Sequence, residues 1–165
     1  MKKTLKQILT ALVSIMVLVG LDQVSKILAV AYLKDKDPFV ILDGIFELRY
    51  LENHGAAFGI LQNQQIFFYI LTVVVILGLI WLYMFRIPMG KKYLPLNLVD
   101  VALIAGACGN LIDRVQQSYV VDFFYFKLID FPIFNVADCY VTCACVLLFA
   151  LILFFYKEED LQGII

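Results

Sequence analysis

The chain has little charge for its size. Only 16% of its 165 residues are Asp, Glu, Lys or Arg, and 63% are hydrophobic. The average soluble domain has about 25% charged residues. The formal net charge is −1, and no segment carries a basic stripe, which argues against a nucleic-acid partner. A soluble globule this apolar would expose large apolar patches to water, and a disordered chain would be less hydrophobic. The composition therefore indicates an integral membrane protein with one domain over residues 1–165.

The chain also lacks the residues of a zinc site or of a covalent hydrolase. It has one histidine, His54, and four cysteines without CxxC spacing, Cys108, Cys139, Cys143 and Cys145. A structural zinc site needs four ligands, so we expect the cysteines to be small buried hydrophobic side chains and His54 to be an ordinary loop residue. No Gly-x-Ser-x-Gly sequence is present for acyl transfer. We therefore expect no metal and no other cofactor.

Four apolar segments have about the length that a helix needs to cross a bilayer, which is about 20 residues. They cover approximately residues 8–33, 66–85, 94–113 and 134–156. The first follows three lysines, as a cleaved signal peptide does, but the apolar run is long and no small-x-small site ends it. We therefore expect an uncleaved first span and a protein with four transmembrane helices.

Positive charge near the ends of the spans predicts their orientation. The N-terminal tail is basic, and the connection between the second and third spans carries Arg86, Lys91 and Lys92 without an acid. The connections over residues 34–65 and 114–133 mix basic and acidic residues. This pattern predicts cytoplasmic termini and two outer loops, 34–65 and 114–133.

The outer loops have the composition of β-strands. Residues 39–51 read FVILDGIFELRYL, in which Asp43-Gly44 is a turn signal. Residues 120–126 read VVDFFYF, a second strand-like stretch. The expected fold class is thus an all-α membrane protein with a small β-rich extracytoplasmic loop region.

Several ionisable residues lie in or beside the spans, where each costs about 2.5–3.5 kcal/mol on insertion scales and is a functional hypothesis by default. Asp22 and Lys26 share one face of the first helix. They either neutralise each other or hold this helix against the loop that follows. Asp122 and Asp138 come from separate elements, but the predicted topology brings both to one depth at the outer face.

Two carboxylates in one place suit aspartyl proteolysis. Close together they share a single proton, so one acts as general base toward water while the other acts as general acid. Three other interpretations remain open at this point. The acids are surface residues, or part of a proton-coupled transporter or channel subunit, or belong to a membrane scaffold. Transporters commonly show repeats and midplane sites, whereas this chain shows no repeat and its acids lie near one face.

Five motifs resemble those of the lipoprotein signal peptidases (signal peptidase II) of bacteria, in the same order and over nearly the whole chain. They are Asp22-Gln23-Val24-Ser25-Lys26, Glu52-Asn53-His54-Gly55-Ala56-Ala57-Phe58-Gly59, Gly109-Asn110-Leu111-Ile112-Asp113-Arg114, Val120-Val121-Asp122-Phe123 and Phe134-Asn135-Val136-Ala137-Asp138.

The resemblance implies an intramembrane aspartyl endopeptidase of the bacterial cytoplasmic membrane, with its active site near the outer face. Such enzymes cut diacylglyceryl-modified prolipoproteins just before the lipidated cysteine, so the expected partners are these substrates and the lipid bilayer. A monomer suffices, because one chain carries both acids. The catalytic pair maps onto Asp122 and Asp138. The implied supporting residues are Asn53, Gly55, Asn110, Arg114, Asn135, Asp22, Lys26 and Asp113.

Some of these residues have physically reasonable roles. We expect Arg114 to bind a substrate carbonyl or hold an acid, and Asn110 and Asn135 to donate to a developing oxyanion or to orient Asp138. The run Gly55-Ala56-Ala57 offers a thin backbone surface to an extended peptide, under an outer loop that acts as a lid.

The chain departs from the family pattern at two positions. Ser118 stands where glycine is usual, four residues after Arg114, so the turn toward Asp122 is expected to be built differently. Cys108 stands before Gly109, where small aliphatic residues are commoner.

Overall fold

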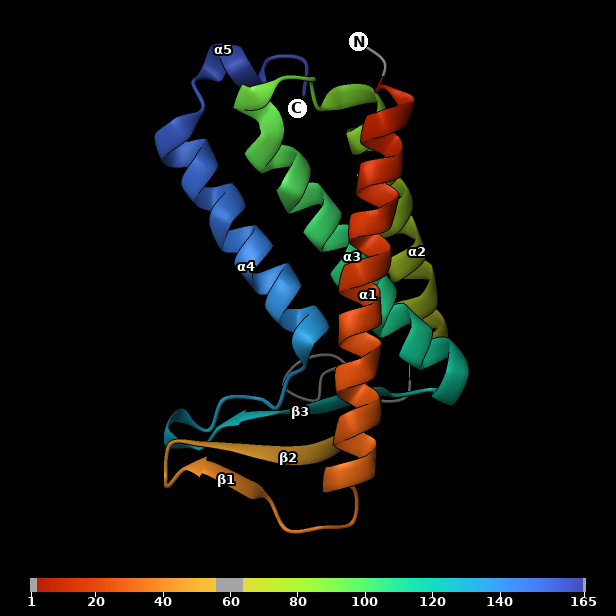
Figure 1. Ribbon diagram of the computed structural model, residues 1–165, viewed down its shortest axis with the longest axis vertical. Coiled ribbons are helices and arrows are strands. Elements are labelled where there is room, and N and C mark those ends of the chain that lie inside the picture. The colour runs from red at the N-terminus through yellow and green to blue at the C-terminus, as the bar shows by residue number, and fades with distance from the viewer. Residues whose placement is uncertain (1–2, 56–63, 165) are drawn as a thin grey trace.

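The computed structural model describes residues 3–55 and 64–164. Four long helices run roughly along one direction, and a small sheet lies across one end of them (Figure 1). The helices are α1 (Leu5–Leu33), α2 (Gln65–Trp81), α3 (Leu94–Gln117), α4 (Val136–Ala150) and the short α5 (Glu158–Leu161). Two π-helical turns, Leu82–Arg86 and Leu151–Phe155, continue α2 and α4, and 3₁₀ turns occupy Lys91–Tyr93 and Lys127–Ile129.

Within the described ranges, four helices are long and apolar enough to cross a membrane, as the hydropathy predicted. Their surfaces are apolar on the outside: Leu21 of α1, Ile70 of α2 and Val146 of α4 are all exposed. This arrangement suits a helix bundle surrounded by lipid.

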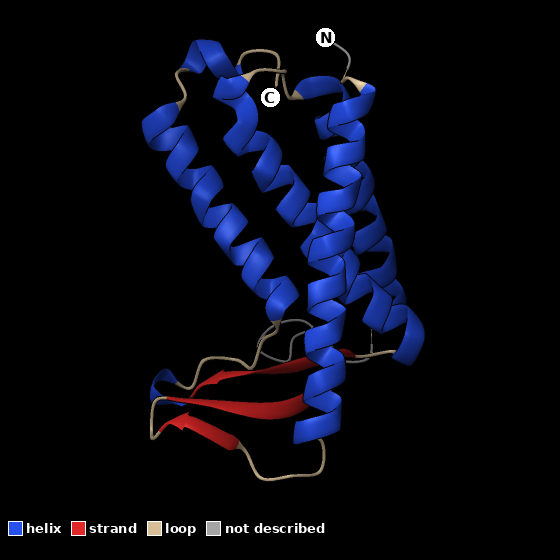
Figure 2. Cartoon of the chain, in the orientation of Figure 1, coloured by secondary structure: helices blue, strands red, loops and turns tan. Residues whose placement is uncertain are grey.

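The sheet is antiparallel, with the order β1 (Phe39–Leu42), β2 (Phe46–Asn53) and β3 (Val120–Phe126) (Figure 2). It confirms the predicted strands. The β1–β2 turn contains Gly44, whose φ of 68° favours glycine. The register slips between Leu48 and Leu51, as in a β-bulge.

The segment that leads into α4 forms backbone hydrogen bonds with the free edge of β3. Phe124 N donates to Phe134 O (2.8 Å), and Phe134 N donates to Phe124 O (3.0 Å). The start of α4 is therefore held beside β3, which is how two segments distant in sequence reach the same site.

Helix α3 extends four residues further than the span that hydropathy predicted, to Gln117. Residues 114–117 contain no glycine or proline that would end a helix. Arg114 therefore lies inside α3 and not in an outer loop.

Candidate active site

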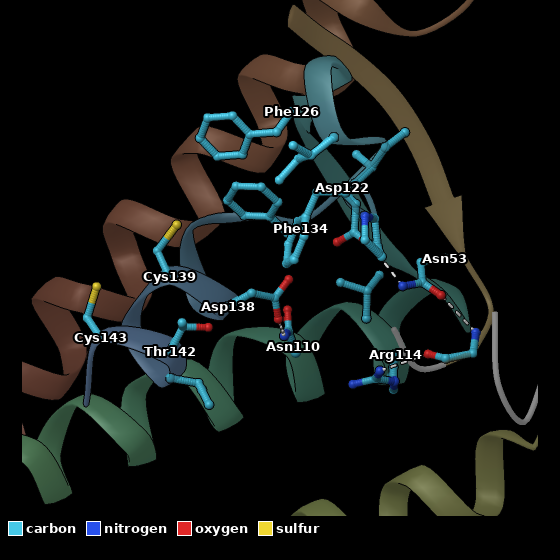
Figure 3. Close-up of a pocket in the computed structure, with 17 residues that line it drawn as sticks. Asn53, Asn110, Arg114, Asp122, Phe126, Phe134, Asp138, Cys139, Thr142 and Cys143 are labelled. Carbon is cyan, nitrogen blue, oxygen red and sulfur yellow. Dashed lines mark hydrogen bonds between the residues drawn. The ribbon is translucent and has the colours of Figure 1, made fainter. Parts of the chain in front are cut away.

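A cavity of about 580 Å³ lies between β3, α3 and the start of α4. Its apolar wall includes Phe126, Ile129, Phe131, Phe134 and Val141. Six of the residues that the sequence singled out line this cavity: Asn53, Gly55, Asn110, Arg114, Asp122 and Asp138. Thr142, which the sequence did not single out, adds a hydroxyl to the wall. In the close-up, Asp122 and Asp138 reach this space from different elements (Figure 3).

Asp122 belongs to β3, and its residue is only 1% exposed. Its Oδ1 accepts from Asn135 Nδ2 (2.6 Å), and its Oδ2 accepts from Asn53 Nδ2 (2.8 Å). Burial, followed by the nearby charge of Asp138, raises the pKa of the Asp122 carboxyl to about 7, although the two amide bonds oppose this shift. A carboxyl with this pKa retains its proton for a substantial part of the time at neutral pH.

Asp138 lies in the first turn of α4, in a reciprocal capping arrangement with Asn135. Asp138 N donates to Asn135 Oδ1 and Asn135 N donates to Asp138 Oδ2, each at 3.1 Å. Asn110 Nδ2 donates to Asp138 Oδ1 at 2.8 Å. The N-terminus of a helix favours negative charge, so this carboxylate has both hydrogen-bond donors and a favourable backbone field. The spacing of Asn135 and Asp138, just before an apolar run, is itself a helix-capping signal in the sequence.

Asn135 joins the two acids and is fully buried, at 0% exposure. Its Nδ2 donates to Asp122 Oδ1 (2.6 Å) and to Asn110 Oδ1 (3.1 Å). Both amide hydrogens are thereby used, so the geometry suits orientation of the acids better than donation to an oxyanion. Asn110 and Asn53 each give one amide hydrogen to an acid.

Arg114 is held by the predicted site residue Gly55 and by two residues of α2, Phe68 and Tyr69, that the sequence did not indicate. Its Nη2 donates to Gly55 O at 3.3 Å, and its guanidinium lies 4.9 Å from the centre of the Phe68 ring. Tyr69 Oη donates to the backbone carbonyl of Arg114 at 2.6 Å. Among the described residues its side chain makes no ion pair. Ala56 and Ala57, which complete the predicted peptide surface, lie outside the described residues, as do residues 58–63 of the outer loop that was expected to act as a lid.

Asp22, Lys26 and Asp113 form a buried ion cluster that is not part of the cavity wall. Lys26 Nζ lies 2.9 Å from Asp22 Oδ2 and 3.0 Å from Asp113 Oδ2. Asp22 and Lys26 thus do pair within α1, but together with a third residue from α3. Gln23, which lies in the first motif but was not predicted to have a role of its own, donates to Asp113 Oδ1 at 2.9 Å.

The cysteines differ from the expectation in part. Cys143 and Cys145 are exposed on α4, and Cys108 and Cys139 are half-buried. The prediction of buried side chains is therefore wrong for Cys143 and Cys145, and Cys139 and Cys143 line the cavity. His54 packs against Tyr119, with ring centres 5.4 Å apart.

Ser118 ends α3 with a φ of 65° and a ψ of 14°. This is the left-handed conformation that usually falls to glycine after a helix. The serine therefore makes the same kind of turn that glycine makes, at some cost in strain.

Comparison with known proteins shows the family to which this chain belongs. The model of the signal peptidase (SPase) II family matches residues 14–154. A lipoprotein signal peptidase of Streptococcus thermophilus (strain CNRZ 1066) is 46% identical over 148 residues, covering 90% of this chain and 93% of the relative. One from Caldanaerobacter subterraneus subsp. tengcongensis is 42% identical over 146 residues, covering 87% of this chain and 96% of the relative.

A solved structure of a bacterial membrane enzyme is also similar to this chain. A bacterial membrane enzyme determined by the in meso method at 2.3 Å resolution matches with a TM-score of 0.79 at 32% identity, covering 95% of this chain and 96% of that chain. The chain therefore belongs to the signal peptidase II family of aspartic proteases.

Proposed function

We propose that this protein removes the signal peptide from diacylglyceryl-modified bacterial prolipoproteins by cutting just before the lipidated cysteine, with Asp122 and Asp138 as its catalytic dyad. The observation that carries the proposal is the convergence of these two acids on one cavity, with Asn135 bonded to both. Membership of the family supports the reaction.

In this mechanism Asp138 is the general base and Asp122 is the general acid. The single negative charge of the pair is more favourable on Asp138, because that residue lies in the first turn of α4. Asp122 lies in a strand, where no helix N-terminus favours its negative charge, so it is the member that holds the proton.

The proton transfers then balance over two steps. Asp138 takes a proton from water, the resulting hydroxide attacks the scissile carbonyl carbon, and Asp122 protonates the carbonyl oxygen. Asp138 next gives its proton to the amide nitrogen as the C–N bond breaks. The hydroxyl proton of the intermediate returns to Asp122, which restores the starting state of the pair.

The cavity suits a lipidated substrate. Its wall combines the aromatic residues Phe126, Phe131 and Phe134 with the apolar face of α4 around Val141. Acyl chains and an apolar signal peptide already reside in the bilayer, so their burial supplies part of the affinity.

The proposed location is the cytoplasmic membrane, with both termini in the cytoplasm and the dyad near the outer face. The described N- and C-terminal ends lie at one end of the helix bundle, and the sheet lies at the opposite end (Figure 1). The basic connection around Lys91 and Lys92 also lies away from the sheet. We also propose that the chain forms a single domain and acts as a monomer. In the transporter alternative we expect acids near the middle of the bundle, whereas this dyad lies beside the sheet.

The direct test uses purified protein in lipid vesicles and a diacylglyceryl-modified prolipoprotein. We expect a product that begins at the lipidated cysteine by mass spectrometry, unchanged by EDTA. Asp122→Asn and Asp138→Asn should each abolish it, while the exposed-loop control Asp37→Asn should not. Cleavage by either dyad variant would overturn the mechanism, and no cleavage by folded wild type would overturn the function.

A further inference from the structure

The buried ion cluster has a second set of bonds, which reaches the backbone beside each catalytic acid. Asp22 Oδ1 accepts from Ala137 N at 2.9 Å, and Asp113 Oδ2 accepts from Val121 N at 3.1 Å. Ala137 directly precedes Asp138, and Val121 directly precedes Asp122. Each carboxylate of the cluster therefore accepts from the backbone N–H of the residue that precedes one member of the dyad.

Lys26 connects these two attachments. Its ammonium contacts Asp22 and Asp113 at 2.9 and 3.0 Å, and all three residues are at most 3% exposed. Buried carboxylates that lack a counter-charge are strongly destabilised, so the ammonium is what lets two of them lie so close together. Its position fixes the distance between them, and with it the distance between the two backbone segments.

A third contact from Lys26 leads directly to the dyad. Lys26 Nζ donates to Asn110 Oδ1 at 2.9 Å, and Asn110 Nδ2 donates to Asp138 Oδ1 at 2.8 Å. The ammonium pulls electron density toward the amide oxygen, which strengthens the amide as a donor to Asp138. The cluster thus acts on Asp138 through both its backbone and its carboxylate.

The close packing of α1, α3 and α4 permits the hydrogen bond between Asp22 and Ala137 N. Asp22 on α1 reaches the backbone of α4 past Gly109 of α3. A Cβ at Gly109 would lie 2.5 Å from Asp22 Oδ2 and 3.3 Å from Ala137 Cβ. Only a residue without a side chain leaves room for the Asp22 to Ala137 bond.

We propose that Asp22, Lys26 and Asp113 form a positioning brace that sets the relative placement of the catalytic acids. This inference rests on the proposed function, because it assigns a role toward the same dyad. None of the three lines the cavity. The brace therefore governs the rate of the chemical step and leaves substrate binding largely unchanged. A displacement of about 1 Å is enough to cost about 100-fold in rate.

The test compares Asp113→Ala with Asp113→Asn, using kcat and KM for a diacylglyceryl-modified prolipoprotein. Alanine removes the acceptor for Val121 N, whereas asparagine keeps a carbonyl oxygen for it. We expect kcat to fall about 100-fold in Asp113→Ala with KM within about twofold, and asparagine to restore at least about tenfold of that loss.

Three results would overturn the brace: an unchanged kcat in Asp113→Ala, equal losses in the two variants, or a rise in KM that accounts for the loss. If Asp113→Ala fails to fold, the pair Asp22→Ala and Asp22→Asn applies the same test to Ala137 N. The proposed function is judged separately, by wild-type cleavage. Wild-type cleavage with no difference between alanine and asparagine overturns the brace alone.

Discussion

Ser118 has a backbone conformation that is unfavourable for a residue with a side chain. With a φ of 65°, it occupies the left-handed region at the end of α3, where a Cβ costs about 1–2 kcal/mol. We expect Ser118→Gly to raise the free energy of unfolding by about 1 kcal/mol, since part of the gain is lost to the greater freedom of glycine in the unfolded chain. Thermal unfolding in detergent measures this difference.

The matched control is Ser118→Ala, which keeps the Cβ and the strain. It should show no comparable gain. An equal rise in both variants would mean that the serine hydroxyl, and not the backbone conformation, is responsible.

Asp122 should make stability depend on pH. Its pKa is raised from 3.8 to about 7 in the folded protein, so between these values the native state holds a proton that the unfolded chain has released. The free energy of unfolding therefore falls as pH rises through this window, by at most about 4 kcal/mol. We expect Asp122→Asn to show a smaller fall between pH 4 and pH 8 in denaturant titrations.

The exposed Asp37 gives the control for this measurement. Asp37→Asn should retain the wild-type dependence on pH. A dependence that persists in full in Asp122→Asn would assign the titration to another group.

For single residues, the sequence predicted the location more accurately than the role: it indicated which residues lie together, but not the contacts that each one makes. The motifs placed Asn53, Asn110 and Arg114 beside the two acids, and the structure brings them to one cavity. The bonds themselves depend on contacts between distant elements, such as that of Asn53 with Asp122. Residue spacing along one element carries no information about such contacts, except in the local cap of Asn135 with Asp138.

At the scale of elements, α3 and α4 pack closely because glycines face the start of α4. A Cβ at Gly106 would lie 2.7 Å from both Ala137 O and Val141 Cγ2. Backbone has to move to accept it, so we expect Gly106→Ala to lower the free energy of unfolding by about 1–3 kcal/mol. Activity should fall as well, because Ala137 adjoins Asp138.

Gly78 of α2 provides the matched control, because a Cβ there meets no atom within 4 Å among the described residues. Gly78→Ala should be neutral or stabilising, by up to about 1 kcal/mol, as alanine favours helix. Thermal unfolding and peptidase assays on both variants decide the matter. A Gly106→Ala variant as stable as Gly78→Ala would refute the close packing.

The elements themselves were largely predictable. The Asp43-Gly44 turn and the β-branched and aromatic residues on either side predicted the β1–β2 hairpin, which the structure confirms. Hydropathy found the four helices but not the end of α3, because three of residues 114–117 are polar and the segment is still helical. Hydropathy follows contact with lipid, whereas a helix ends where backbone geometry changes.

At the scale of the whole molecule, the arrangement has two distinct ends. The sheet and the dyad lie at one end, and α5 and the N-terminal region lie at the other (Figure 1). The distribution of basic residues predicted which connections lie at the same end of the helix bundle. It did not predict that the sheet contacts the segment before α4, because that contact depends on the hydrogen bonds between Phe124 and Phe134. Those bonds join β3 to the segment that precedes α4, and no pattern within one segment reveals such a contact.

The orientation of these two ends is testable in living cells. Asp43 lies exposed in the β1–β2 turn, and Glu159 lies exposed in α5 at the opposite end. In a background whose four cysteines are replaced, we expect a membrane-impermeant maleimide added outside the cytoplasmic membrane to label Asp43→Cys in intact cells. Glu159→Cys should react only after that membrane is permeabilised, because basic residues near span ends favour the cytoplasmic side. The reverse labelling would place the dyad on the cytoplasmic side, where it could not meet a signal peptide whose lipidated cysteine faces outward.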